Sequence, residues 1–271
     1  MAEHYGNASE WLKGDEWDTV MNYDAFMEPL TWYLTGMEKH SDEYRHDLDG
    51  NVNHFIGSIK HHIAQMLTPS LMVAMNELSN HDHSRFLTRT NHITGRVQKL
   101  GYDAAGQHVN EAIMREAVVM QMTWVGAPTV YYGDEAGVVG FTDPDNRRSY
   151  PWGKENKQLL QFHKDAIRIH KQSEALRTGS IEILGGKYST LVYGRFNENE
   201  KIAVVVNGSK DPIEIKVPVW RLDVPKDCVM TRLLYTYQDG YSVKEGKYKV
   251  VDGEIVLKMG RYAAMILQYK K

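Results

Sequence analysis

The segment Ser70-Leu-Met-Val-Ala-Met-Asn-Glu77 is a short apolar run that ends in polar residues, and Leu78-Ser-Asn-His-Asp-His-Ser-Arg85 follows it directly. Such a run is typical of a buried strand in a parallel sheet. In parallel α/β folds, reactive groups gather just beyond the carboxyl ends of the strands. The pattern therefore predicts a strand over 70–77 with a functional site immediately after it.

Similar runs and amphipathic segments lie on both sides of this strand. Two further strand-like runs cover 18–24 and 128–133. Apolar residues at helical spacing cover 26–38, 52–66, 110–124 and 159–169. Because strand-like and helical segments alternate, we expect a parallel sheet covered by helices.

The pattern changes after Gly179, where strand-length runs alternate with turn signals. The runs cover 188–196, 201–206, 213–219 and 262–269, and the turn signals are Gly185-Gly186, Asn207-Gly208 and Asp252-Gly253. This alternation predicts an antiparallel β-sandwich. We therefore expect two domains, an α/β domain over 1–177 and a sandwich over 178–271.

The length of the first domain limits its architecture. A closed barrel of eight strand–helix units needs about 250 residues, whereas only 177 residues precede the sandwich. Either this part is a small open sheet, or the chain is the back portion of a larger fold.

Composition excludes several classes of protein. With a formal charge of −3 and a pI near 6.5, the chain has no basic field for binding nucleic acid. Its one cysteine, Cys228, rules out an internal disulfide framework and a thiolate zinc cluster. No apolar run is long enough for a membrane helix, and the first residues lack a signal-peptide layout, which predicts a cytoplasmic protein without membrane contact.

Carboxylates follow all three strand-like runs. The polar groups are Asn22 to Asp24, Asn80 to Arg85, and Tyr131 to Glu135. Glycoside cleavage needs such carboxylates, since one protonates the leaving oxygen and another faces the developing oxocarbenium charge. The alternative is that they cap the following helices, but a cap needs only one oxygen, so it does not account for the cluster at 80–85.

The segment 78–85 resembles the strand-seven motif of the α-amylase superfamily (glycoside hydrolase family 13), in which Asn-His-Asp is followed by Arg. Gly126-Ala-Pro-Thr-Val-Tyr-Tyr-Gly-Asp-Glu135 is similar to the strand-eight motif, and 14–23 resembles the strand-six region. Residues 143–152 resemble the loop of the neopullulanase, cyclomaltodextrinase and amylopullulanase branch. The resemblance covers nearly the whole chain and implies the C-terminal part of a (β/α)₈ TIM barrel, about strands six to eight with their helices, followed by the sandwich.

The resemblance also implies roles for single residues. His81 would contact sugar hydroxyls and Asp82 would stabilise the transition state, with Asn80 and Arg85 as further substrate-binding residues. Glu3 lies at the family's distance before the strand-six region and is the candidate proton donor. On the long loop, we expect Trp152 to stack on a sugar ring.

The family's nucleophile is the aspartate of an Arg-x-Asp motif on strand four, and strands one to four have no counterpart in this chain. Arg221-Leu-Asp223 mimics the motif but follows the strand-eight segment, and Arg45-His-Asp47 lies in a polar loop. We expect neither aspartate to act as the nucleophile, so the isolated chain is expected to be inactive.

The resemblance implies part of a retaining hydrolase of α-1,4-linked glucans or maltooligosaccharides. The alternatives are a non-catalytic carbohydrate-binding or scaffolding fragment and one half of a split enzyme. A cut barrel edge would favour self-association or capture of a complementary N-terminal fragment. No organic cofactor is implied. Calcium is common in the family, but its usual ligands would lie mainly in the absent half, and the histidines here form no evident metal set.

Overall fold

The computed structural model describes residues 1–271. Helices dominate up to residue 178: η1 (Tyr23–Met27), α1 (Glu28–Thr35), α2 (Val52–Ile63), α3 (Thr68–Met72), α4 (Phe86–Arg89), α5 (Val97–Leu100), η2 (Tyr102–Gly106), α6 (Glu111–Thr123), η3 (Asp145–Arg147), α7 (Lys157–Gln172) and α8 (Glu174–Thr178). The helices expected over 26–38, 52–66, 110–124 and 159–169 are confirmed as α1, α2, α6 and α7 with shifted ends. No helix combines the length and the apolar character that a membrane span requires.

The parallel strands are much shorter than the sequence predicts. β1 (Met75–Asn76) pairs in parallel with β2 (Ala127–Pro128). Single parallel bridges join Met21 to Met75 and Ala2 to Val20, so four chain segments lie side by side. The strand expected over 70–77 is wrong in its first half, because Pro69 at the start of α3 favours a helical turn there.

Strands dominate after residue 179. They are β3 (Ser180–Lys187), β4 (Thr190–Phe196), β5 (Glu200–Asn207), β6 (Ile213–Val217), β7 (Cys228–Tyr237), β8 (Gly240–Ser242), β9 (Gly246–Val250), β10 (Ile255–Met259) and β11 (Ala263–Lys270), with the short helix η4 (Val219–Leu222). One sheet has the order β3-β4-β5-β11-β7-β8, with β9 also paired to β7, and β6 pairs with β10 in a second sheet. The expected sandwich strands are confirmed as β4, β5, β6 and β11.

Strand β3 and the three strands β8 to β10 were not among the predicted runs. Gly185-Gly186 is not a turn but lies inside β3, where the register with β4 shifts as in a β-bulge. Glycine at φ +151° tolerates the irregular backbone of this bulge. Because Gly185-Gly186 was interpreted as a turn, strand β3 was not predicted.

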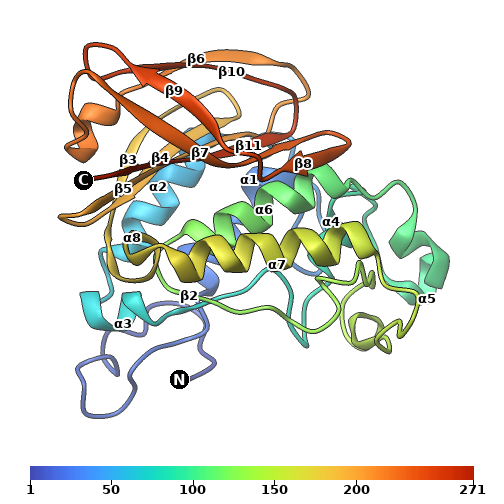
Figure 1. Ribbon diagram of the computed structural model, residues 1–271. Coiled ribbons are helices and arrows are strands. Elements are labelled where there is room, and N and C mark those ends of the chain that lie inside the picture. The colour runs from blue at the N-terminus through green and yellow to red at the C-terminus, as the bar shows by residue number, and fades with distance from the viewer.

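The central strand β5 separates two apolar cores. Its residues Ile202, Val204 and Val206 belong to the larger core, which also includes α1, α2, α6 and α7. Its residues Ala203 and Val205 face the smaller core between the two sheets. This alternation follows from the two-residue period of a strand. Figure 1 shows the sheets stacked over α6 and α2, with α7 below and the N terminus at the far end.

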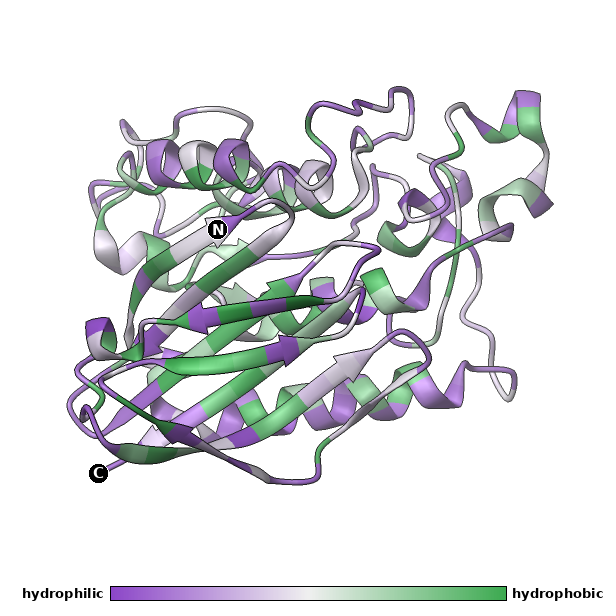
Figure 2. Cartoon of the chain, turned by 90° about the horizontal axis from the view of Figure 1, so that it is seen from above, coloured by the Kyte–Doolittle hydropathy of each residue, from purple (hydrophilic) through white to green (hydrophobic).

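The larger core crosses residue 178, so the expected domains 1–177 and 178–271 share apolar contacts. Helix α6 is buried on nearly all sides because the sheet covers one face and other helices the rest. Seen from above, hydrophobic residues concentrate along the sheet strands (Figure 2). The sandwich thus forms one wall of the core that supports the parallel segments.

Candidate active site

Three polar side chains converge at the carboxyl ends of the parallel segments. The Nε2 atom of His81 lies 3.7 Å from Oε1 of Glu3 and 3.5 Å from Oδ1 of Asp82. One side-chain donor atom from each residue lies within 4.8 Å of the others. All three side chains are open to solvent, with 41%, 45% and 42% exposure for Glu3, His81 and Asp82. The structure therefore brings together the two expected carboxylates and the expected histidine at one accessible place.

An open hollow of about 460 Å³ adjoins Asp82. It is lined by Tyr5, Lys39, His40, Asp82, Arg96, Thr142 and Asp143. Oδ1 of Asp82 also lies 3.9 Å from Nη2 of Arg147. The hollow therefore offers an aromatic ring and charged groups of both signs to a polar ligand.

Asn80 shapes the turn that carries Asp82. Its Oδ1 accepts the backbone N–H groups of Asp82 at 3.0 Å and His83 at 2.9 Å. Its Nδ2 donates to the hydroxyl of Tyr23 at 3.1 Å and to Oε1 of Glu77 at 2.8 Å. The side chain is buried, and all of these groups belong to the chain itself. Asn80 therefore fixes the backbone of Asp82 instead of facing the hollow, as a substrate-binding residue would.

Tyr23 connects this turn to Glu3. Its hydroxyl donates to Oε1 of Glu3 at 2.9 Å. Its ring stacks on Tyr5, with centroids 4.4 Å apart and planes at 12°. Burial is the main cause that raises the pKa of Tyr23, so the hydroxyl keeps its proton at neutral pH. Tyr23 is therefore a permanent hydrogen-bond donor to Glu3.

Two buried titratable groups lie beneath the exposed cluster. Burial raises the pKa of Glu77 to about 8, although the hydrogen bond from Asn80 opposes the change. Burial, with the nearby positive charge of Arg89, lowers the pKa of His83 to about 2. The Nε2 atom of His83 lies 3.0 Å from the hydroxyl of Tyr5. Both groups are therefore uncharged at neutral pH.

Arg85 has no exposed surface in this structure. Its Nη1 donates to Oδ1 of Asp134 at 3.0 Å and to the carbonyl of Tyr132 at 2.6 Å, and its Nε donates to the carbonyl of Asn146 at 2.8 Å. Burial raises the pKa of Asp134, against the opposing effect of Arg85. The guanidinium group thus ties the loop after β2 to the 80–85 segment and is enclosed by the chain, away from any direct substrate contact.

Trp152 is 81% exposed and lies on the loop between β2 and α7. Its ring packs at a tilt of 47° against Tyr150, with centroids 4.5 Å apart. It does not line the hollow beside Asp82. A sugar stacked on Trp152 would therefore lie outside this hollow.

Glu3, His81 and Asp82 are also close enough to ligate a metal ion. Imidazole and carboxylate donors suit several divalent metals. However, the positive charge of Arg147 lies beside Asp82 and would oppose binding of a cation.

Comparison with known sequences identifies the family. Residues 1–179 match the family described as Alpha amylase, catalytic domain. The chain belongs to the alpha-amylase family. It is 31% identical over 294 residues to an amylopullulanase of Thermoanaerobacter thermohydrosulfuricus, covering 98% of this chain and 18% of the relative. It is 32% identical over 226 residues to neopullulanase 2 of Thermoactinomyces vulgaris, covering 80% and 33%.

Solved structures agree with the fold of this alpha-amylase-family chain. The native debranching enzyme of Nostoc punctiforme superposes with a TM-score of 0.76 at 22% identity, covering 98% of this chain and 51% of that one. The expected fold class, the C-terminal part of a (β/α)₈ barrel followed by an antiparallel β-sandwich, is confirmed. The chain spans a third or less of the curated relatives named above and about half of the solved structure.

The two Arg-x-Asp segments of this family member lie outside the parallel strands. Asp223 is an exposed residue at the end of η4, in the sandwich part. Asp47 is exposed in the loop between α1 and α2, where its Oδ2 pairs with Arg45 at 2.7 Å. Neither residue lies in the cluster of Glu3, His81 and Asp82.

The supporting roles of Tyr23, Glu77 and His83 were not predicted from the sequence. All three lie at the ends of the parallel segments, and that position could have identified them. Their burial could not be foreseen, because it depends on the loops that fold over them.

Proposed function

We propose that this chain provides part of the active site of a retaining α-glucan hydrolase. The observation that supports the proposal is the convergence of Glu3 from one parallel segment and of His81 and Asp82 from another around one solvent-open point. Carboxyl oxygens less than 5 Å apart can both contact a single sugar ring, as cleavage of a glycosidic bond requires.

In the proposed mechanism Glu3 donates its proton to the leaving glycosidic oxygen. Tyr23 holds Oε1 of Glu3 through its hydroxyl and leaves the other oxygen free for the proton transfer. Asp82 supports the positive charge that develops on the ring, and its backbone is held by the turn that Asn80 organises. His81 lies between the two carboxylates and donates to sugar hydroxyls.

The nucleophile of this proposal lies outside the 271 residues. In the first step its carboxylate forms a glycosyl–enzyme bond as the glycosidic bond breaks and Glu3 protonates the leaving oxygen, and water then hydrolyses the intermediate with Glu3 as base. We expect the segment that carries it to pair with the open backbone edges at Ala2 and β2, as a complementary fragment would.

The proposed substrates are α-1,4-linked glucans and maltooligosaccharides. The names of the relatives, amylopullulanase and neopullulanase, support this class. A second candidate function is carbohydrate binding without catalysis. The positions of Asp47 and Asp223, away from the cluster, favour that candidate for the isolated chain.

The release of reducing sugar from maltohexaose by the purified chain tests the proposal. We expect binding without turnover for the isolated chain, and turnover after addition of a segment that carries an Arg-x-Asp strand. The Glu3→Gln and Asp82→Asn variants should abolish the restored activity. Turnover by the isolated chain that Asp82→Asn removes would contradict the proposed origin of the nucleophile, and restored turnover that survives both substitutions would contradict the proposed roles.

A further inference from the structure

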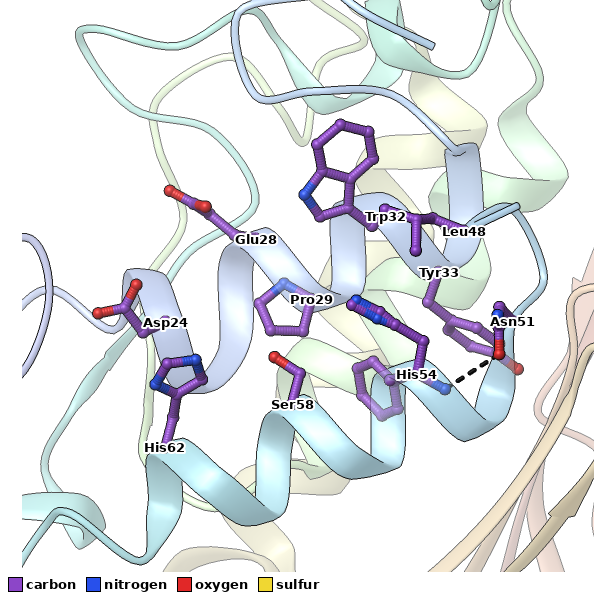
Figure 3. Close-up of a pocket in the computed structure, with 11 residues that line it drawn as sticks. Asp24, Glu28, Pro29, Trp32, Tyr33, Leu48, Asn51, His54, Ser58 and His62 are labelled. Atoms are coloured by element: carbon purple, nitrogen blue, oxygen red, sulfur yellow. Dashed lines mark hydrogen bonds between the residues drawn. The ribbon is translucent and has the colours of Figure 1, made fainter. Parts of the chain in front are cut away.

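A second cavity lies between the segment η1–α1 and helix α2 (Figure 3). Its volume is about 150 Å³. It is lined by Asp24, Glu28, Pro29, Trp32, Tyr33, Leu48, Asn51, His54, Phe55, Ser58 and His62. None of these residues belongs to the Glu3, His81 and Asp82 cluster.

Two rows of side chains at four-residue spacing border this cavity. Asp24, Glu28 and Trp32 come from η1 and α1, and His54, Ser58 and His62 come from α2. Residues four apart lie on the same face of a helix. Figure 3 shows the α2 row directed toward α1, with Pro29 between the rows. Both helices bury an apolar stripe at their contact, as packed helices normally do, and the polar rows line the cavity beside this stripe.

The base of the cavity is rigid and apolar. Phe55 is buried, and its ring packs against Tyr33 at 5.0 Å and Trp124 at 5.7 Å between centroids. Pro29 occupies the first turn of α1 and is also buried. The side chain of Asn51 accepts the backbone N–H of His54 at 3.0 Å and so fixes the start of α2. The cavity is therefore formed before any ligand binds.

Most polar groups of the two rows remain free for a ligand. The side chains of His54, Ser58 and His62 form no hydrogen bond to another residue of the chain, although each can donate and accept. Asp24 uses Oδ2 to accept the N–H of Gly6 at 2.9 Å, which leaves Oδ1 available. Two imidazoles, a hydroxyl and a carboxylate oxygen thus surround an apolar base.

These features define the chemistry of the occupant. Asp24 and Glu28 disfavour an anion, and the paired imidazoles and hydroxyl suit a neutral polyol better than an organic cation. The cavity is smaller than the roughly 300 Å³ of drug-sized sites, so it accepts one ring and not a chain. A pyranose combines an apolar face for Trp32 or Pro29 with hydroxyls for the polar rows.

We propose that this cavity is a second sugar-binding site, which takes a single pyranose unit of an α-glucan. The identity of the sugar rests on the proposed function, whereas the site itself is separate. An ion pair between Glu28 and Lys39 lies between this cavity and the hollow beside Asp82, because Glu28 lines the cavity and Lys39 lines the hollow. A glucan held at both places would be anchored on two sides of this pair.

Titration of the isotope-labelled chain with maltose, observed by NMR, tests the proposal. The signals are the indole N–H of Trp32, assigned with a Trp32→Phe variant, and the imidazole of His81. We expect roughly millimolar maltose to shift the Trp32 signal. The Ser58→Phe variant, which fills the cavity and removes no hydrogen bond within the chain, should weaken maltose binding beside Trp32 by about tenfold or more. The control variant His81→Ala should change the affinity for maltose that the Trp32 signal reports by less than about twofold.

The outcomes separate this proposal from the proposed function. A Trp32 shift that persists in His81→Ala supports the second site, even if maltose never moves the His81 signal and the proposed function fails. A His81 shift without a Trp32 shift overturns the second site and leaves the proposed function intact. Loss of the Trp32 shift in His81→Ala, or no weakening in Ser58→Phe, also overturns it. A larger Trp32 shift with tetramethylammonium than with maltose overturns the assignment of a neutral sugar.

Discussion

The parallel strands and the sandwich strands of this protein are held together in different ways. β1 and β2 have two residues each, whereas β7 has ten. Buried polar side chains such as Asn80 and Arg85 connect the parallel segments, while alternating apolar residues fill both faces of β5. The geometry of the site therefore depends on a few specific hydrogen bonds, whereas the sandwich depends on the volume of its apolar side chains and on their alternation along the strands.

The buried ion pair should give the largest effect on stability. Asp134→Ala leaves Arg85 buried without its partner, so we expect a loss of about 3–5 kcal/mol in the free energy of unfolding, measured by urea denaturation. The control is Asp143→Ala, which removes an exposed pair to Arg147 on the same loop and should cost at most about 1 kcal/mol. Equal losses in both variants would contradict the importance of the buried network.

In the sandwich core, the free energy of unfolding should depend more on the volume of an apolar side chain than on its chemical type. Leu267 is fully buried between the two sheets, so Leu267→Ala should cost about 3 kcal/mol in the same denaturation experiment. Leu267→Met keeps the volume and should cost less than about 1.5 kcal/mol. If the methionine variant were as unstable as the alanine variant, the contrast between the two regions would be lost.

Glu77 should make stability fall as the pH rises. Its folded-state pKa of about 8 is above the ordinary value, so the folded chain retains a proton that the unfolded chain releases. Its stabilising effect is complete below the ordinary pKa of about 4.3 and is lost as the pH rises through about 8.

Between about pH 5 and pH 7 the free energy of unfolding of the unsubstituted protein should therefore fall by at most roughly 2–3 kcal/mol more than that of Glu77→Gln. Urea denaturation of both proteins over this pH range measures the difference. Glutamine keeps the acceptor for Asn80 and cannot ionise in this range. Parallel pH curves for the two proteins would show that Glu77 is ionised at neutral pH, in contradiction to its burial.

The hydroxyl of Tyr23 should have a small effect on stability and a specific effect on Glu3. Tyr23→Phe removes two hydrogen bonds, the one that the hydroxyl donates to the Glu3 carboxylate and the one that it accepts from Asn80, which together should cost about 2 kcal/mol. A crystal structure of the variant should show Glu3 in more than one rotamer while the 80–85 turn is unchanged. An unchanged, single rotamer of Glu3 would show that Tyr23 does not position it.

The sequence predicts most of the fold because apolar periodicity determines which faces are buried. Helices α2 and α6 and strands β5 and β11 were predictable for this reason. The parallel strands were not predicted in length, because their order depends on tertiary hydrogen bonds such as that from Asn22 to Asn76 at 2.8 Å. Strand β3 was hidden by two glycines that serve a bulge.

The sequence predicted which residues lie at the site, but it did not predict which of their side chains are exposed to solvent. Glu3, His81 and Asp82 were expected from the family motifs and lie together. Asn80 and Arg85 come from the same motif, yet both are buried. Sequence could not separate these two from their exposed neighbours, because burial is decided by the loop after β2, including Asp134 and Asn146.

A crystal structure of the chain with bound maltotriose tests the central claim most directly. We expect a pyranose ring with hydroxyl or ring oxygens about 3 Å from side-chain atoms of Glu3, His81 and Asp82. The central claim would be contradicted if ordered maltotriose contacted none of these three residues. It would also be contradicted if no maltotriose bound beside them at a saturating concentration.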